Sequence, residues 1–368
     1  MRVLITGAGG FVGKNLVVRL QELEAFEPIA FGRGDDVDGL REQVRRVDAI
    51  VHLAGVNRPA DEAMFSAANA ELTCLLCEMI RAEGREVPFL FASSIQAECD
   101  NPYGRSKRAG ERHVTALADE GNPTIIYRLP NIFGKWCRPN YNSVVATFCH
   151  NIATGLPIRI DDPDAEVRLV YIDDVVSEFV TALRETAKGL EWRSIEPEYA
   201  TTVGTIAERI RAFARSRETL VSEPVGVGFD RALYATFISY LPTDSFAYGL
   251  PKHADPRGVF VEVLKTRDTG QFSYFTAGPG VTRGGHYHHT KTEKFLVLRG
   301  NARFRFRNIQ TDEHVELHAS GDCPMIVETI PGWSHDITNV GTEEMVVMLW
   351  ANEIFDRERP DTVASRVA

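Results

Sequence analysis

The hydrophobic pattern of the chain changes once, near residue 240. Up to about Ile238, short apolar runs typical of buried strands alternate with longer amphipathic stretches typical of helices. The segment 239–258 is rich in Pro and Gly, and beyond it the apolar residues fall into short alternating runs separated by turns. The change predicts two domains, one over residues 1–243 and one over residues 244–368.

The first domain is predicted to be an α/β fold with a doubly wound parallel sheet. Strands are expected over Met1–Thr6, Pro28–Arg33, Asp48–Gly55 and Val87–Ser94, with helical stretches such as Asp61–Glu83 between them. Alternation of strands and helices places helices on both faces of a mostly parallel sheet. Ligands of such sheets bind beyond the carboxyl ends of the strands. Functional residues are therefore expected at those ends.

The second domain is predicted to be all-β. Strands are expected over residues 260–265, 270–277, 293–300, 302–308, 313–319 and 343–350. Short strands with frequent turns are typical of a jelly-roll barrel. The predicted fold class is therefore a Rossmann-like doubly wound sheet followed by an antiparallel barrel.

A glycine-rich turn follows the first strand directly. Gly7, Gly10 and Gly13 have the spacing G-x-x-G-x-x-G, and a helix is expected from Phe11 to Leu20. Such a turn lets the backbone approach a pyrophosphate, and the helix N-terminus offers free N–H groups to the anion. Its position between strand and helix favours a dinucleotide site over an ordinary turn. The expected cofactor contacts are Gly7, Gly10, Phe11, Val12, Gly13 and, at the end of the third strand, Ala54.

The second strand ends at Arg33, where a residue that reads the adenosine ribose is expected. An acidic residue there would bind the 2′-hydroxyl of NADH, whereas an Arg can pair with the 2′-phosphate of NADPH. Arg33 therefore favours NADPH. Asp35 and Asp36 lie close behind it and leave NADH open.

Three polar residues near the end of the fourth strand suggest carbonyl reduction. Tyr103 and Lys107 are four residues apart at the expected start of a helix, so they share one face. A neighbouring ammonium lowers the pKa of a phenol, which helps Tyr103 to exchange a proton with a carbonyl oxygen. Ser94 can hydrogen-bond the same oxygen, and we prefer it to Ser93.

A second candidate site lies in the all-β part. His286 and His288 are two residues apart, so on a strand they point to one side, and Glu293 can join them from the next strand. His335 follows a later turn. These ligands suit a divalent metal, and zinc accepts them readily. The alternative is a solvent-exposed histidine cluster without a ligand.

Charge and hydropathy exclude several partners. The formal net charge of −10 argues against a nucleic-acid partner, which would require a basic surface. The sequence has neither an apolar run of membrane-spanning length nor a signal-peptide pattern at its start, so we expect a cytoplasmic protein.

Over roughly its first 240 residues, the chain resembles the extended short-chain dehydrogenase/reductase family, especially its nucleotide-sugar branch. The matching segments are GAGGFVG, HLAG, ASSIQA, YGRSK, RLPNIFG and RLVYIDDV. The resemblance implies that Ser94, Tyr103 and Lys107 are catalytic, and that Lys107 also contacts a nicotinamide cofactor. It further implies that Asn131 and Arg168 bind the substrate. The alternative for Arg168 is a surface ion pair with Asp173 or Asp174.

The second part resembles the cupins. G-G-H-Y-H-H, Glu293, Gly300 and P-G-W-S-H match the two cupin motifs. In the metal-binding cupins, His286, His288, Glu293 and His335 would be ligands. In the metal-free deoxysugar epimerases, which share an R-G-x-H-Y stretch, His286 would instead be a catalytic base. Because His288 replaces the glutamine of those epimerases, we favour the metal. Other acid or base candidates are Tyr287, Lys291, Lys294 and Asp336.

The combination resembles the bifunctional capsular polysaccharide enzymes of the UDP-N-acetyl-L-fucosamine route. This resemblance implies C3 epimerisation of a UDP-4-keto-6-deoxy-N-acetylhexosamine in the cupin, reduction at C4 with NADPH, and a homodimer formed through the cupin. The product would be UDP-2-acetamido-2,6-dideoxy-L-talose.

Two alternatives remain open. One is a nucleotide-sugar epimerase or dehydratase with tightly bound NAD. Ile95 and Gln96 stand where a dehydratase usually has an acidic pair, which argues against that activity. The other is a non-catalytic sugar-nucleotide sensor with a cupin dimerisation module. An intact Ser94, Tyr103 and Lys107 argue against it, since a sensor does not require a proton-transfer set.

Overall fold

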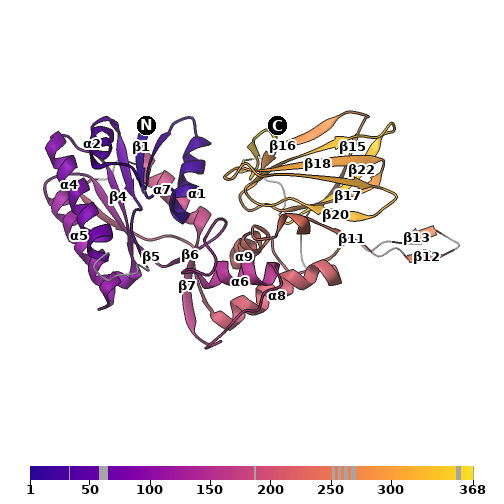
Figure 1. The fold of residues 1–368 in the computed structure, drawn as a ribbon, viewed down its shortest axis with the longest axis horizontal. Coiled ribbons are helices and arrows are strands. Elements are labelled where there is room, and N and C mark those ends of the chain that lie inside the picture. Colours follow the sequence, from indigo (N-terminus) through magenta and orange to yellow (C-terminus); the bar gives the residue numbers. More distant parts are fainter. Residues whose placement is uncertain are drawn as a thin grey trace. The chain divides into compact units, whose positions relative to one another are not determined.

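A computed structural model describes residues 1–32, 34–57, 65–185, 188–250, 253–255, 258–260, 264–266, 271–353 and 358–367. The chain divides into two compact units (Figure 1). Unit 1 comprises Met1–Ser143 and Val167–Thr201, and unit 2 comprises Val144–Glu166 and Thr202–Ala368. In the described part of the chain, no helix has both the length and the apolar character needed to cross a membrane.

Unit 1 contains the predicted doubly wound sheet. Among the described residues, six parallel strands lie in the order β2 (Glu27–Phe31), β1 (Arg2–Thr6), β3 (Ala49–His52), β4 (Phe89–Ser94), β5 (Thr124–Leu129), β8 (Leu190–Arg193). Helices α1 (Phe11–Gln21) and α7 (Ile172–Arg184) cover one face. Helices α2 (Val37–Arg46), α4 (Leu72–Glu83) and α5 (Pro102–Asp119) cover the other (Figure 1). The prediction of this fold is confirmed.

Three smaller features complete the unit. A π-helical turn, η1 (Ser66–Glu71), precedes α4, and the first residues of the helix expected over Asp61–Glu83 lie outside the described residues. A short 3₁₀ helix, η2 (Ile95–Glu98), follows β4. The strands β6 (Asn131–Phe133), β7 (Glu166–Tyr171) and β9 (Glu198–Thr202) form a separate small sheet.

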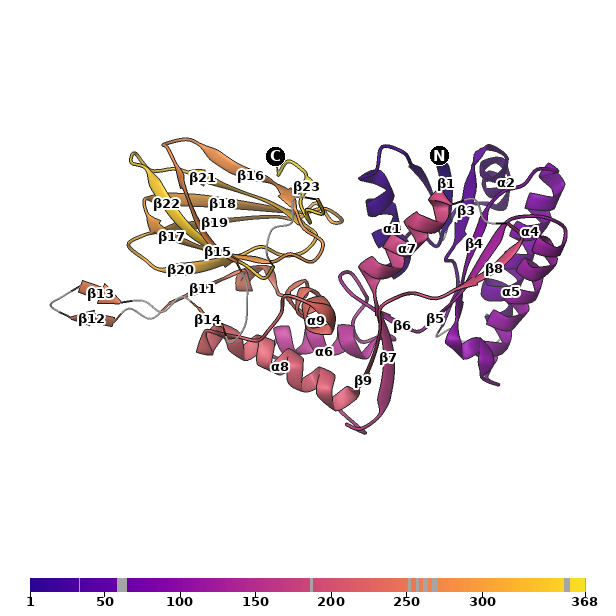
Figure 2. The same ribbon diagram turned by 180° about the vertical axis from the view of Figure 1, so that it is seen from behind.

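Unit 2 begins with helices and ends with the β-rich domain. Its helices are α6 (Val144–Ala153), α8 (Val203–Thr219) and α9 (Gly228–Ile238), with a short η3 (Thr243–Ser245). The described residues then form two five-stranded antiparallel sheets (Figure 2). One is ordered β11 (Ala247–Gly249), β20 (Met325–Glu328), β17 (Glu293–Arg299), β22 (Met345–Ala351), β15 (Gln271–Ala277). The other is ordered β19 (His314–Ser320), β18 (Asn301–Asn308), β21 (Trp333–Asn339), β16 (Thr282–Tyr287), β23 (Val363–Ala364).

The alternating pattern of β18 shows why this domain folds as two sheets around an apolar interior. Phe304 and Phe306 are buried, whereas the arginines between them are more exposed. The Phe304 ring lies 5.7 Å from that of Phe295 on β17, which joins the two sheets across the core. Alternation of this kind places one face of each strand in the interior. The β-rich, cupin-like prediction is confirmed.

Several strands of this domain were not predicted, and one predicted strand differs. The missed strands include β11, β20, β21 and β23. The strand β21 (W-S-H-D-I-T-N) was missed because it is polar in sequence, although all of its residues are buried. The strand expected over residues 260–265 is not continuous. Phe260 ends β13 (Gly258–Phe260), which pairs with β12 (His253–Asp255), whereas Lys265 begins β14 (Lys265–Thr266), which pairs with β10 (Val221–Ser222). Residues 261–263 lie outside the described residues.

A buried ion network joins α8 to the first barrel sheet within unit 2. The Glu328 carboxylate on β20 accepts hydrogen bonds from Lys294 on β17 and from Arg217 on α8. The Lys294 ammonium also lies 3.1 Å from the Tyr248 hydroxyl. Burial opposes ionisation of Glu328, but these two cations lower the pKa of its carboxyl. The network therefore stays charged and depends on the single carboxylate at its centre.

We expect Glu328→Gln to lower the free energy of unfolding by about 3–5 kcal/mol, because it leaves two buried cations without their anion. Urea unfolding of unit 2, followed by tryptophan fluorescence, measures this loss. The matched control is Glu343→Gln, which removes an exposed partner of Arg299 and should leave the stability close to that of wild type. Equal losses in the two variants would contradict the prediction.

Candidate functional site

The glycine turn has the geometry that close backbone contacts require. Gly7 has φ +71°, and a Cβ there would lie 2.8 Å from Cα of Ala54, at the end of β3. A Cβ on Gly13 would lie 2.3 Å from the Gly7 carbonyl oxygen. Neither position can accommodate a side chain without movement of the backbone, so the structure holds β1, α1 and the residues after β3 tightly together. These are the segments from which the cofactor contacts were predicted.

The start of α1 is open to an anion. Gly10 precedes the helix and provides no side-chain cap. The first N–H groups of a helix, here including those of Phe11 and Val12, have no acceptor within the helix. This arrangement fits a pyrophosphate. Arg33, which was predicted to select NADPH, lies outside the described residues.

The structure distinguishes the two serines at the end of β4. The Ser93 hydroxyl is buried and donates to Glu111 Oε1 over 2.6 Å. The Ser94 side chain is hydrogen-bonded to Tyr103 and accepts from the Gln96 amide over 3.2 Å. Neighbouring residues of a strand point to opposite faces. Ser94 therefore lies with Tyr103, whereas Ser93 is part of a buried contact between β4 and α5.

Lys107 lies one turn beyond Tyr103 on α5. Its ammonium is buried and donates to the Ala92 carbonyl over 2.9 Å. A Cβ on Gly55 would lie 3.4 Å from Nζ, so the ammonium also borders the segment that follows β3. Tyr103 and Lys107 thus both lie at the carboxyl ends of the strands, near the expected path of the cofactor.

The pKa values of this pair are governed by burial. Burial lowers the pKa of Lys107 to about 8, although Glu111 opposes the shift. Burial also raises the pKa of Tyr103, while the hydrogen bond with Ser94 opposes the rise. The expected lowering of the phenol pKa by Lys107 is therefore not what the structure shows, because desolvation is the larger effect. In this structure Tyr103 is a protonated donor.

The pH dependence of reduction should follow Lys107. Its ammonium loses its proton as the pH rises through about 8, whereas Tyr103 stays protonated in that range. If the positive charge supports catalysis, kcat/KM for ketone reduction will be constant below pH 8 and fall by about tenfold per pH unit above it. A profile measured from pH 6.5 to 9.5 tests this. A flat profile through that range would contradict a role for the charge.

The two residues expected to bind substrate lie side by side in the small sheet of unit 1. The Asn131 side-chain amide donates to the backbone carbonyl of Arg168 over 3.3 Å. The exposed Arg168 guanidinium pairs with both oxygens of Glu198. The ion-pair partner of Arg168 is thus Glu198 and not Asp173 or Asp174, which were the expected alternatives. The Asp173 carboxylate instead accepts from the buried Lys135 over 2.6 Å.

The four predicted metal ligands come together in the barrel. In the described part of the chain, one donor atom each from His286, His288, Glu293 and His335 lie within 4.8 Å of one another. Glu293 Oε2 is 3.3 Å from His288 Nε2 and 3.6 Å from His335 Nε2. His335 Nε2 is buried and has no hydrogen-bond partner among the described residues. A buried nitrogen in this position fits a metal ion.

The protonation states also fit a metal. Burial lowers the pKa of His286 to about 4, and the neighbouring His335 and His288 add to the shift. Burial likewise lowers the pKa of His335. Burial alone would raise the pKa of Glu293, but the neighbouring His288 and His335 hold it well below the usual range. Neutral imidazoles and an ionised carboxylate are the forms that bind a metal.

The cluster opens into a pocket of about 230 Å³. Its walls are mainly apolar. The lining includes Phe275, Phe295, Phe304, Phe306, Arg283, His286, Glu293, His335 and Asp336. A small number of polar groups in an apolar cavity is typical of a small-molecule site.

The structure separates the other acid or base candidates. Asp336 lines the pocket, and both of its oxygens pair with Arg305, at 3.0 and 2.6 Å. The Lys291 ammonium lies 2.9 Å from Glu293 Oε1. Lys294 belongs to the buried network with Glu328, and Tyr287 is buried in the strand position next to His286. Asp336 is thus the one of these four residues that lines the pocket, but its carboxylate lies with Arg305 on the face of β21 opposite to His335.

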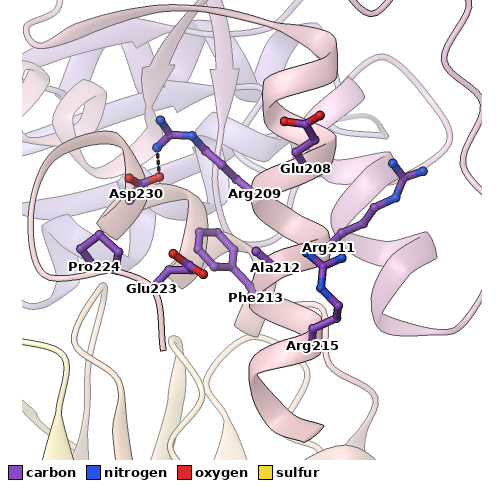
Figure 3. Close-up of a pocket in the computed structure, with 9 residues that line it drawn as sticks. All are labelled: Glu208, Arg209, Arg211, Ala212, Phe213, Arg215, Glu223, Pro224 and Asp230. Atoms are coloured by element: carbon purple, nitrogen blue, oxygen red, sulfur yellow. Dashed lines mark hydrogen bonds and ion pairs between the residues drawn. The ribbon is translucent and has the colours of Figure 1, made fainter. Parts of the chain in front are cut away.

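A larger groove of about 650 Å³ lies along α8 and the segment before α9 (Figure 3). It contains none of the predicted site residues. Its lining carries arginines and carboxylates in equal number, and Arg209 is paired with Asp230. This balance of charge favours neither an anion nor a cation as a ligand.

Comparison with known proteins places this geometry in a family. A model of the NAD dependent epimerase/dehydratase family matches residues 3–195, and a model of the polysaccharide biosynthesis C-terminal domain matches residues 253–363. The chain is 57% identical over 368 residues to the UDP-2-acetamido-2,6-beta-L-arabino-hexul-4-ose reductase of Pseudomonas aeruginosa. This match covers 100% of the chain and 99% of the relative.

Solved structures agree over the full length. The capsular polysaccharide assembling protein CapF from Staphylococcus aureus has a TM-score of 0.68 and 40% identity, with 100% of both chains covered. A structure of CapF with the inhibitor 3-isopropenyl-tropolone has a TM-score of 0.64 and 37% identity, again with 100% of both chains covered. The chain therefore belongs to the NAD dependent epimerase/dehydratase family, and is an enzyme of its nucleotide-sugar 4-ketoreductase and epimerase group in polysaccharide biosynthesis.

Proposed function

We propose that the chain is a bifunctional nucleotide-sugar enzyme. The barrel epimerises C3 of a UDP-4-keto-6-deoxy-N-acetylhexosamine, and the N-terminal domain then reduces the C4 ketone with NADPH. The product is UDP-2-acetamido-2,6-dideoxy-L-talose. The observation that most supports this proposal is that one chain holds both a Ser94–Tyr103–Lys107 set and a His/Glu cluster at a separate pocket.

The chemistry fixes the order of the two steps. The hydrogen at C3 is acidic only while C4 is a ketone, because the resulting carbanion is stabilised as an enolate. Epimerisation must therefore precede reduction. We assign the proton transfer at C3 to the barrel and the hydride transfer at C4 to the N-terminal domain.

In the reductase site, the residues have distinct tasks. A nicotinamide cofactor, when bound, would supply the hydride for C4. Tyr103 donates its proton to the carbonyl oxygen, which becomes the C4 hydroxyl, and Ser94 hydrogen-bonds that oxygen. Lys107 provides positive charge beside the tyrosine and contacts the cofactor. The choice of NADPH rests on Arg33, which follows β2 in the sequence.

In the barrel, His286, His288, Glu293 and His335 would hold a divalent metal, which we propose to be zinc. Such an ion supplies Lewis-acid polarisation of a ketone oxygen. The Asp336 carboxylate is paired with Arg305 on the opposite face of the sheet from His335, so we assign it no part in the proton transfer. The inhibitor in the related CapF structure is a tropolone, and tropolones chelate metal ions through two adjacent oxygens, which supports this assignment.

The alternative in which His286 is the base of a metal-free site makes an opposite prediction, because epimerisation would then survive treatment with a chelator. We also propose a homodimer formed through the barrel and a domain boundary between residues 243 and 244.

The test is product analysis with a UDP-4-keto-6-deoxy-N-acetylhexosamine and either NADPH or NADH. We expect oxidation of one NADPH per product, slower turnover with NADH, and a product whose C3 configuration is inverted by NMR. Reduction with the C3 configuration retained would show a simple ketoreductase. Binding without turnover would show a sensor.

A further inference from the structure

The loop that follows β16 is held by one carboxylate from the C-terminal segment. Asp361 Oδ1 accepts from the His289 amide over 2.8 Å, and Oδ2 accepts from the amides of Thr290 and Lys291 over 2.6 and 2.7 Å. The Thr290 hydroxyl also donates to Oδ2 over 3.0 Å. Successive amides that converge on an anion fix the backbone of a loop.

Charge supports this clamp. Burial opposes ionisation of Asp361, yet the neighbouring His289 and the amide hydrogen bonds hold the pKa of its carboxyl well below the usual range. The Asp361 carboxyl group is therefore ionised in the folded protein near neutral pH.

The same residue also contacts the first side chain of the loop. The backbone carbonyl of Asp361 accepts a hydrogen bond from His288 Nδ1. With the proton on Nδ1, the Nε2 atom of a neutral imidazole presents a lone pair, and it faces Glu293 Oε2 at 3.3 Å. A lone pair on Nε2 is the form in which the imidazole can bind a metal beside Glu293. Asp361 thus selects the tautomer of His288 that can bind a metal.

The segment around Asp361 is built into the barrel. β23 pairs with β16 in the register His286↔Ala364 and Tyr287↔Val363. The Ser365 amide donates to the Gly285 carbonyl over 2.9 Å. Residues 361–365 therefore contact both the strand that carries His286 and the loop that carries His288.

We propose that Asp361 is a positioning residue of the barrel site, and that it orients His288 and the loop 288–291 for metal binding. This inference rests on the proposed metal function of His286, His288, Glu293 and His335. Asp361 is not itself a ligand, because its carboxylate oxygens are bound to the loop amides. An outer group that fixes a ligating histidine commonly changes metal affinity strongly.

The test is Asp361→Asn in the full-length protein. An amide group cannot accept hydrogen bonds at both positions. The loop therefore loses some of its hydrogen bonds to residue 361, while the side chain keeps its size. Zinc affinity is measured by competition with a chromogenic chelator, and ligand geometry by the visible absorption of the Co²⁺-loaded protein. We expect zinc affinity to fall by about 10- to 100-fold and the Co²⁺ spectrum to change. The control is Asp312→Asn, an exposed carboxylate of the same barrel, with neither property changed.

The outcomes separate the possible explanations. If Asp361→Asn lowers only the melting temperature of the metal-free protein, with wild-type zinc affinity and Co²⁺ spectrum, the role is structural and the proposal is wrong. If the wild type binds no zinc, both this proposal and the proposed metal site are wrong. If Asp361→Asn does not fold, Thr290→Val decides, because it removes the hydroxyl that donates to Asp361 and accepts from Arg231 but keeps the loop amides. A smaller loss of zinc affinity supports the proposal, and an unchanged affinity overturns it.

Discussion

Tyr103→Phe should lower kcat for reduction of the 4-keto sugar by about 10²- to 10⁴-fold, the usual contribution of a positioned proton donor. The change removes one oxygen, which in the structure is hydrogen-bonded to Ser94. Because the phenol pKa is raised by burial, Tyr103 is protonated at neutral pH and ready to donate. NADPH oxidation followed by absorbance measures the loss.

The variant should still bind NADPH, since the glycine turn and the start of α1 are unchanged. Cofactor affinity, from quenching of tryptophan fluorescence, should stay within about twofold of wild type. Tyr274→Phe is the matched control, because Tyr274 is 74% exposed on β15 of the barrel. A Tyr103→Phe enzyme that reduces the substrate at close to the wild-type rate would show that another group protonates the C4 oxygen.

His286→Ala should lower the rate of proton exchange at C3, again by about 10²- to 10⁴-fold. His286 lines the pocket and belongs to the four-residue cluster, so its loss removes either a metal ligand or the base. Reduction of a substrate that already has the inverted C3 configuration should be little changed. NMR of each reaction separates the two activities.

His318→Ala provides the control for this variant. His318 lies on β19, and its side chain is 64% exposed and pairs with Glu316. The His318→Ala variant removes an imidazole from the same barrel without altering the pocket. If the two variants had the same C3 exchange rate, the cluster would have no part in epimerisation.

The sequence alone predicted the parts of the fold that depend on local pattern. The glycine turn, the helix that begins with Pro102 and Tyr103, and the convergence of His286, His288, Glu293 and His335 follow from spacing and strand geometry, and the structure has them in these places. These features involve either neighbouring residues or a motif whose partners are recognisable in sequence.

Other features depend on contacts between distant segments. Asp361 lies in no motif, and its role becomes visible only when β23 pairs with β16. Likewise, Arg168 pairs with Glu198, because β7 and β9 lie in one small sheet. β21 was missed for the opposite reason, since its polar residues are buried only because the strand lies inside the sheet. The sequence contains no local signal for any of these.

The direct test of two separate sites is deuterium incorporation at C3 in D₂O with NADPH withheld, followed by NMR for wild type, Tyr103→Phe and His286→Ala. We expect wild type and Tyr103→Phe to exchange the C3 hydrogen at similar rates, and His286→Ala to show no exchange above the uncatalysed rate. Exchange that persists in His286→Ala, or that is lost in Tyr103→Phe, would place the C3 chemistry in the reductase site and contradict the account.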